Sequence, residues 1–235
     1  MKILALESSA VAASVAVCED EVLIAQSFQR TGLTHSATLM AMTEDLLKNA
    51  GLTPAEMDVI AVAAGPGSFT GLRIGVSAAK GLAWALDKPC AACSTLESMA
   101  WQVVHMEGEI CPVMDARRQQ VYNARFEVKD GTLTRLTEDR AISIAELMEE
   151  VKKSGKRQIL VGDGAHLCYN AFQEQGIPVV MTPPHLRFQT AWGVARQAVE
   201  LARADGLTTA AALAPEYHRL SQAERERLSK EEATK

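Results

Sequence analysis

A glycine-rich stretch, residues 65–71, is the first candidate for chemistry in this sequence. Backbone N–H groups at such a turn, just before a helix, can bind phosphate. The stretch is not a P-loop, because Leu72 and Arg73 follow Gly71 where a lysine and a hydroxyl residue are required. Nor is it a dinucleotide fingerprint, since Thr70 stands in place of the third glycine. The residues alone favour a sharp strand-to-helix turn, with a generic capacity for anions that Arg73 would assist.

Three carboxylates follow predicted strands. Glu7 ends the first strand, Asp115 closes "CPVMD", and Asp163 lies in "VGDG". Carboxylates at strand ends often mark a ligand crevice in α/β folds. Residues 7–13 contain no basic side chain, which argues against a tight triphosphate site and leaves a weak nucleotide or anion site. The candidates for that site are Glu7, Ser8, Ser9, Asp115, Gly162, Asp163 and Gly164.

The sequence predicts no metal site, no cofactor and no catalytic residue. Cys90 and Cys93 form a C-x-x-C without the second pair that zinc requires, so we interpret them as buried, reduced thiols in a strand. The chain has five cysteines, an odd number that does not suit a disulfide framework. Its histidines include no H-x-x-x-H pair, and no Ser/His/Asp arrangement is visible.

Composition narrows the class of protein. The 235 residues carry a net charge of −5 and are 48% hydrophobic, which indicates a globular protein without the basic stripe of a nucleic-acid binder. Glu7 interrupts the apolar N-terminal run too early for a signal peptide. No apolar run approaches membrane-spanning length, so we expect a cytoplasmic protein without membrane contact.

The order of predicted elements indicates an α/β protein with mixed sheets. Three strands form a meander, and a helix, a strand, a second helix and a further strand follow them. A comparable set of strands and helices begins near residue 105, and the last helix, near 190–204, is expected to return to the first lobe. We therefore predict a first lobe of residues 1–104 plus about 188–214, a second lobe of 105–187, and a tail of 215–235, charged and loosely held from Ser221.

The predicted helices at 34–50 and 70–86 are unusually apolar. Ile74, Ala78 and Leu82 lie in a predicted helix that has few polar positions. A helix that is apolar on almost every side must be buried on almost every side. Gly71, Gly75 and Ala79 recur every four residues, a spacing that would let another helix approach closely. We favour a partner interface, and burial within the same chain is the alternative. If these helices form a partner interface, Gly75→Leu or Ala79→Trp is expected to block partner binding and to leave the monomer folded.

Several motifs together resemble one family. "MKILALESS", "AGPGSFTGLRIGVSAAKGLA", "STLESMA", "MDARRQQVY", "VGDGA" and "PEYHR", in this order, are similar to the TsaB (YeaZ) family. The resemblance implies the actin-like ATPase (ASKHA, RNase H-like) fold, with two lobes of βββαβα type. It also implies a non-catalytic subunit of the complex that makes N6-threonylcarbamoyladenosine at position 37 of tRNA.

The resemblance further implies a set of partners. The catalytic paralogue TsaD would bind through the first two helices and the ATPase TsaE would be a third partner. The same surface would form a homodimer when the chain is alone, and tRNA would be contacted only indirectly or weakly. The candidate partner-binding residues are His35, Leu39, Met42, Leu46, Gly71, Arg73, Ile74, Gly75, Ala78, Ala79 and Leu82.

One difference from TsaD bears on catalysis. The TsaD family carries two metal-binding histidines, and Thr95 and Met99 stand at the matching positions here. A hydroxyl and a thioether are poor ligands for such a cation, so the chain is expected not to be an enzyme. The alternative is a stand-alone actin-like ATPase or small-molecule kinase, using Glu7, Asp115 and Asp163 around magnesium.

Overall fold

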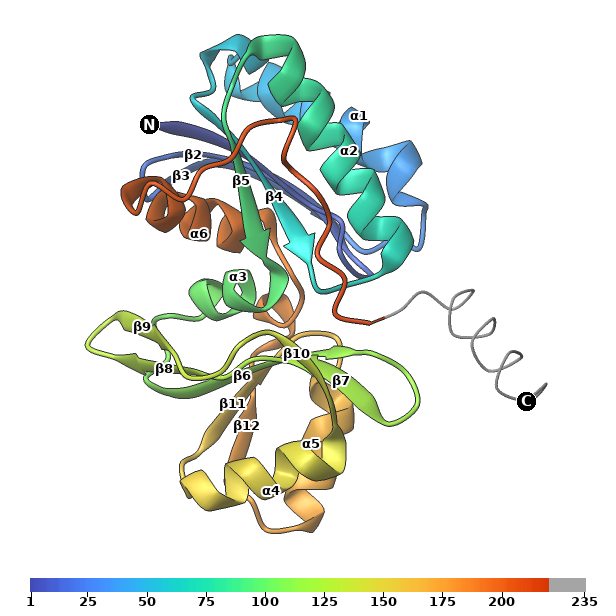
Figure 1. The fold of residues 1–235 in the computed structure, drawn as a ribbon, viewed down its shortest axis with the longest axis vertical. Helices are drawn as coiled ribbons and strands as arrows, with labels where there is room; N and C mark the ends of the chain where they lie inside the picture. Colours follow the sequence, from blue (N-terminus) through green and yellow to red (C-terminus); the bar gives the residue numbers. More distant parts are fainter. Residues whose placement is uncertain (220–235) are drawn as a thin grey trace, which may run out of the picture.

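The computed structural model describes residues 1–219, which fold into two lobes stacked one above the other (Figure 1). The upper lobe is built on a five-stranded sheet of order β3-β2-β1-β4-β5. Its elements are β1 (Lys2–Glu7), β2 (Ala13–Glu19), β3 (Val22–Gln29), α1 (His35–Ala50), the 3-10 turn η1 (Pro54–Glu56), β4 (Val59–Gly65), α2 (Phe69–Leu86), β5 (Cys90–Ser94) and α3 (Thr95–Gln102).

The lower lobe repeats this strand order. Its sheet runs β10-β7-β6-β11-β12, and the hairpin β8–β9 pairs with β6. In both sheets the first three strands of the order are antiparallel and the last three are parallel. Its elements are β6 (Gly108–Asp115), β7 (Gln120–Asn123), β8 (Phe126–Lys129), β9 (Thr132–Arg135), β10 (Arg140–Ser143), α4 (Ile144–Ser154), β11 (Gln158–Val161), α5 (Ala165–Glu174), β12 (Val179–Met181) and η2 (Pro184–Leu186). The last helix, α6 (Ala191–Arg203), follows them in the chain.

The central strands of the upper sheet are apolar because helices cover both of its faces. β4 reads "VIAVAAG" and is buried throughout. One core lies between the sheet and α1–α2, and includes Leu39 and Val76. The other lies between the sheet and α6, and includes Val194. Continuous apolar strands are typical of parallel sheets that are buried on both faces.

Helix α6 returns to the upper lobe, as the sequence predicts, and packs against β1, β2 and α3. Gly193 permits the crossing with α3, because a Cβ atom there would lie 2.1 Å from the carbonyl oxygen of Ser98. The prediction of buried thiols is confirmed, since all five cysteines are free and buried.

After α6 the chain forms a strap over the upper lobe, residues 207–219. Thr208 pairs with Cys90 at the edge of β5, and Leu213 is buried against α2 and its sheet. Glu216 donates its N–H to the carbonyl of Ala64 at 2.7 Å. Residues 215–219, assigned from the sequence to a tail, therefore contact the body of the protein, whereas the loosely held part expected from Ser221 lies outside the described residues.

Candidate functional site

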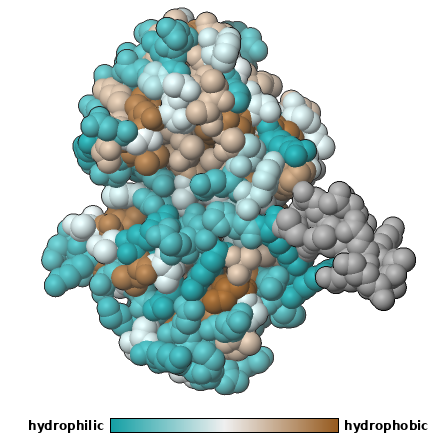
Figure 2. Space-filling view, in the orientation of Figure 1, coloured by the Kyte–Doolittle hydropathy of each residue, from teal (hydrophilic) through white to brown (hydrophobic). Residues whose placement is uncertain are grey.

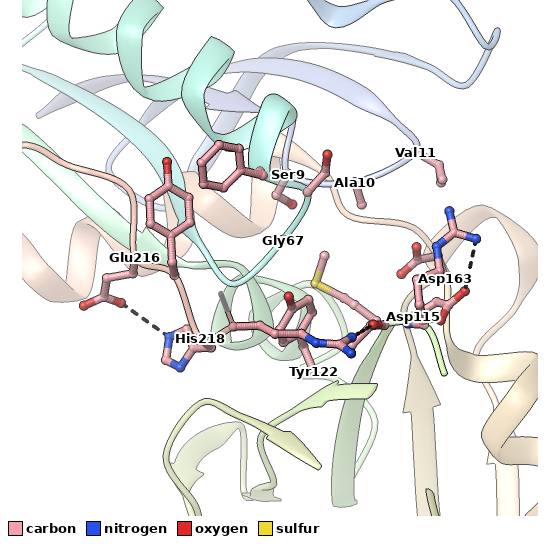
Figure 3. Close-up of a pocket in the computed structure, with 16 residues that line it drawn as sticks. Ser9, Ala10, Val11, Gly67, Asp115, Tyr122, Asp163, Glu216 and His218 are labelled. Carbon is pink, nitrogen blue, oxygen red and sulfur yellow. Dashed lines mark hydrogen bonds and ion pairs between the residues drawn. The ribbon is translucent and has the colours of Figure 1, made fainter. Parts of the chain in front are cut away.

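A cavity of about 440 Å³ lies between the two lobes (Figure 3). The turn after β1 and the glycine-rich turn before α2 form its upper side. The end of β6 and the turn after β11 form its lower side, where Asp115 and Asp163 lie together. The strap closes it with Glu216, Tyr217, His218 and Arg219. The remaining lining residues are Ser9, Ala10, Val11, Gly67, Ser68, Phe69, Met114, Ala116, Arg117 and Tyr122.

A buried and a partly buried carboxyl group, those of Glu7 and Asp163, belong to this region. Glu7 Oε1 accepts the N–H of Ser9 at 2.5 Å, while Oε2 has no hydrogen-bond partner among the described residues. Burial raises the pKa of Glu7 to about 7, against the smaller opposite effect of the Ser9 hydrogen bonds. Burial also raises the pKa of Asp163, and the nearby charge of Asp115 acts in the same direction. The side-chain amide of Gln189 donates a hydrogen bond to Asp163 Oδ1 at 3.5 Å, and this bond lowers the pKa of Asp163.

Gly162 and Gly164 bring the "GDG" turn against the end of β6. Gly162 has φ +112°, and a Cβ atom there would lie 2.1 Å from the carbonyl oxygen of Val113. A Cβ atom on Gly164 would lie 3.1 Å from the backbone nitrogen of Asp115. Glycine is therefore required for the close approach that places Asp163 beside Asp115.

The two serines of the candidate anion site have different surroundings. Ser9 lines the cavity, and its buried Oγ has no partner among the described residues. Ser8 does not line it, because its Oγ donates to the carbonyl of Gly71 at 2.9 Å and joins β1 to α2. The structure thus places Ser9, Asp115 and Asp163 around one cavity, with Glu7 behind Ser9 and Ser8 in a structural contact.

The side chains around the cavity supply only part of a site for a metal-bound triphosphate, the ligand that the actin-like fold implies. Asp115 and Asp163 line the cavity together, and carboxylates of this kind can hold a phosphate-bound magnesium ion. The Arg219 guanidinium, by contrast, donates to the carbonyl of Ala116. Within residues 1–219, no three His, Cys, Asp or Glu side chains are grouped to hold a metal ion.

Glu7→Gln is expected to stabilise the protein at alkaline pH. Because the folded chain raises the pKa of Glu7 from 4.5 to about 7, folding opposes its ionisation, and the wild type loses stability as the pH rises across this interval. Glutamine keeps an acceptor for the Ser9 N–H without the charge. Urea unfolding should show the variant about 2–3 kcal/mol more stable at pH 8 and equal to wild type near pH 4.5. A difference that does not grow with pH would contradict this.

The second candidate region is the pair α1–α2, and here part of the sequence interpretation is wrong. Gly71, Gly75 and Ala79 are buried by the chain itself. A Cβ atom on Gly71 would lie 2.2 Å from the carbonyl oxygen of Ser8, and one on Gly75 would lie 2.5 Å from Ser8 Oγ. Gly71 and Gly75 thus admit the protein's own β1–β2 turn rather than a partner helix. Leu39, Met42 and Leu46 are likewise buried in the core of the upper lobe.

Other apolar residues of α1 and α2 remain accessible. Ile74, Ala78 and Leu82 are partly buried, and two further apolar residues of these helices, Met40 and Trp84, are exposed, Trp84 by 70%. Met40, Ala41, Leu47, Leu52 and Leu82 contribute to a surface groove of about 490 Å³. In Figure 2 the upper lobe is tan and brown over α2 and the adjacent strap, whereas the lower lobe is mainly teal. We call the exposed side of these helices the α1–α2 face.

Two polar candidates on these helices are engaged within the chain. His35 Nε2 lies 2.7 Å from the carbonyl oxygen of Ala10 and fixes the start of α1 to the turn after β1. The Arg73 guanidinium stacks on the Phe69 ring at 3.8 Å, and its Nε donates to the Tyr217 hydroxyl at 2.9 Å. Tyr217 in turn stacks on Phe69, with ring centroids 4.7 Å apart. Arg73 therefore ties α2 to the strap.

The two positions that the family resemblance aligns with the TsaD histidines lie in α3, between the lobes. Thr95 and Met99 are both buried, and Met99 packs with Leu96 and Phe126 in a core that joins α3 to the lower sheet. Neither side chain faces the cavity.

Comparison with known proteins identifies the family. The sequence model of TsaD, described as tRNA N6-adenosine threonylcarbamoyltransferase, matches residues 27–226. The tRNA threonylcarbamoyladenosine biosynthesis protein TsaB of Bacillus subtilis is 36% identical over 167 residues, which are 71% of this chain and 73% of that protein. The chain belongs to the TsaB family. TsaB of Escherichia coli is 29% identical over 75% of this chain and 78% of its own.

The fold agrees with this assignment. YeaZ from Pseudomonas aeruginosa superimposes with a TM-score of 0.74, covering 92% of this chain and 99% of that one at 23% identity. The repeated strand order in the two lobes is that of the actin-like ATPase fold, so the predicted fold class is confirmed. In residues 1–219 of this TsaB-family protein, no helix is long and apolar enough to cross a membrane.

Proposed function

We propose that this TsaB-family protein is the non-catalytic subunit of a tRNA threonylcarbamoyladenosine-forming complex and docks on the TsaD-type catalytic paralogue through the α1–α2 face. The observation that carries the proposal is the accessible apolar groove between α1 and α2, in a chain of this family. Contiguous apolar surface on a soluble domain marks an interaction site, and adaptable methionine suits one. Of the residues predicted from the sequence, Ile74, Ala78 and Leu82 are available for this contact.

The non-catalytic role is supported by Thr95 and Met99. A buried hydroxyl and a buried thioether occupy the places of the metal-binding histidines that the resemblance assigns to TsaD. The chain therefore contributes a docking surface to the complex and no catalytic residues.

The other partners follow from the same proposal. TsaE joins as the ATPase of the complex, and the net charge of −5 favours indirect contact with tRNA. We further propose that the protein acts in the cytoplasm and associates with a second copy of itself when TsaD is absent.

The test is reconstitution of tRNA modification from TsaD, TsaE and a source of threonylcarbamoyl-adenylate, with and without this chain. We expect modification only when the chain is present and none with the chain alone. Modification at full rate in its absence, or by the isolated chain, would overturn the proposal.

A stand-alone ATPase or small-molecule kinase remains the second candidate, because Ser9, Asp115 and Asp163 do line a cavity between the lobes. Calorimetry of the isolated chain with ATP and magnesium separates the two functions. Tight binding followed by hydrolysis would favour the enzyme, whereas absence of binding heat favours the subunit.

A further inference from the structure

The turn between β6 and β7 has an unusual backbone. Arg117, Arg118 and Gln119 have φ angles of +66°, +56° and +59°, so three successive residues adopt the left-handed conformation. Residues with a Cβ atom avoid this conformation, and asparagine and aspartate tolerate it best. In residues 1–219 the other non-glycine residues with positive φ are all aspartates: Asp20, Asp87, Asp130 and Asp205. Two arginines and a glutamine are therefore the exception in this part of the chain.

Backbone hydrogen bonds hold the turn in this conformation. Asp115 Oδ1 accepts the N–H of Arg117 at 2.7 Å. The carbonyl of Gln119 accepts the N–H of Ile144 at 3.1 Å, which ties the turn to the start of α4. Both bonds use backbone groups of the turn, so asparagine or glycine could make them with less strain. The backbone therefore gives no reason for arginine at positions 117 and 118.

The two arginine side chains are accessible to a ligand outside the chain. Arg117 is 86% exposed, and its guanidinium lies 4.0 Å from Asp115 Oδ2. Arg118 is exposed and has no hydrogen bond or ion pair within the described residues. Strained backbone that the surrounding structure maintains is concentrated at functional sites. An exposed guanidinium on such a turn is placed to bind an anion through charge-assisted hydrogen bonds.

Carboxylates of a protein fit this turn better than the phosphates of RNA. Proteins that bind an RNA backbone present a stripe of basic residues, whereas this chain has a net charge of −5. Asp115 lies beside Arg117, and Asp163 lines the same cavity, so a phosphate that approached there would meet two carboxylates. Arg118 is left as a single accessible cation, which suits a bidentate contact with a carboxylate.

We propose that the Arg117–Arg118 turn binds acidic side chains of the TsaD-type partner, as a second contact beside the α1–α2 face. This inference rests on the proposed function. Phe69, the first residue of α2, lines the same cavity as Arg117, so the turn lies near the start of that helix. A protein that covers the α1–α2 face and extends past the start of α2 therefore reaches the turn. The turn keeps two arginines where asparagine would make the chain more stable.

Arg118→Asn separates this docking role from a purely structural one. Asparagine relieves the left-handed strain, so the urea concentration at half-unfolding should rise rather than fall. Titration calorimetry should show that the affinity for TsaD is weakened at least about tenfold, because a charge-assisted contact is lost. This loss of affinity should shrink as the salt concentration is raised, since salt screens an exposed ion pair.

Two variants serve as matched controls. Gln119→Asn relieves the strain at the next residue and keeps both arginines, so it should raise the urea midpoint and leave the affinity unchanged. Arg157→Asn removes one positive charge from an exposed position of the lower lobe and should also leave the affinity unchanged. Equal weakening by Arg118→Asn and Arg157→Asn would reduce the effect to net charge and overturn the proposal.

The outcomes distinguish this contact from the proposed function. If the wild type binds TsaD and Arg118→Asn binds it with the same affinity, the contact is wrong and docking through the α1–α2 face stands. Unchanged affinity for TsaD with weaker binding of tRNA would assign the turn to RNA and also overturn the proposal. A wild type that does not bind TsaD at all would overturn the proposed function, and this contact with it.

Discussion

Gly75→Leu is expected to remove at least about 3 kcal/mol from the free energy of unfolding, enough to leave much of the protein unfolded at physiological temperature. A Cβ atom at this position would lie 2.5 Å from Ser8 Oγ and 3.3 Å from Val62 Cγ2. The first neighbour cannot move freely, because the Ser8 hydroxyl donates to the carbonyl of Gly71. A leucine would therefore have to separate α2 from the turn after β1.

Urea unfolding followed by circular dichroism measures this loss, and Gly81→Ala is the matched control. Gly81 lies on the exposed side of the same helix, and a Cβ atom there has no neighbour within 4 Å. Alanine should stabilise the helix at that position by about 0.5–1 kcal/mol. If Gly75→Leu instead folded with wild-type stability and only failed to bind TsaD, the small-residue stripe would be an interface after all.

The spacing of small residues in α2 predicts a close neighbour without identifying it. Small residues four apart indicate that something approaches the helix closely, and Gly71 and Gly75 do have such a neighbour. The spacing does not identify the neighbour, because a strand of the same chain and a helix of another chain require the same missing side chains. Here the neighbour is Ser8, more than sixty residues earlier in the sequence.

Much of the fold could be predicted because its signals are local. Short stretches of sequence suffice to predict the apolar strands β1 and β4 and the helix that ends before Gly51. β10, four residues long, was missed because only its pairing with β7 makes it a strand. A short segment with no periodicity of its own carries no such signal.

The candidate site likewise contains residues that the sequence predicts and residues that it does not. Asp115 and Asp163 follow buried strands, so their position at the cavity could be expected from the order of elements. The strap was missed, although it supplies four lining residues, because its place depends on distant contacts. Glu216 reaches the carbonyl of Ala64, and Tyr217 reaches Phe69 and Arg73. Its one sequence signal was the "PEYHR" motif of the family resemblance, which does not say where the segment lies.

The second large effect, weaker binding of TsaD, is expected from charged substitutions on the α1–α2 face. Met40→Glu combined with Leu82→Glu is expected to weaken TsaD binding at least about 100-fold, about 2.7 kcal/mol. The two residues line one groove from two helices, so the pair of carboxylates would be desolvated without partners when a protein covers it. In the free chain Met40 is exposed and Leu82 is partly buried, so unfolding free energy should fall by no more than about 1 kcal/mol.

Titration calorimetry against purified TsaD measures the affinity, and the tRNA-modification assay should fall in parallel at limiting protein concentration. Leu167→Glu adds one carboxylate at an exposed leucine of the lower lobe and should change neither quantity. Because both proteins carry added carboxylates, a general effect of net charge would appear in each of them. Wild-type affinity in the double variant, with the fold intact, would mean that TsaD docks elsewhere and that another molecule covers this groove.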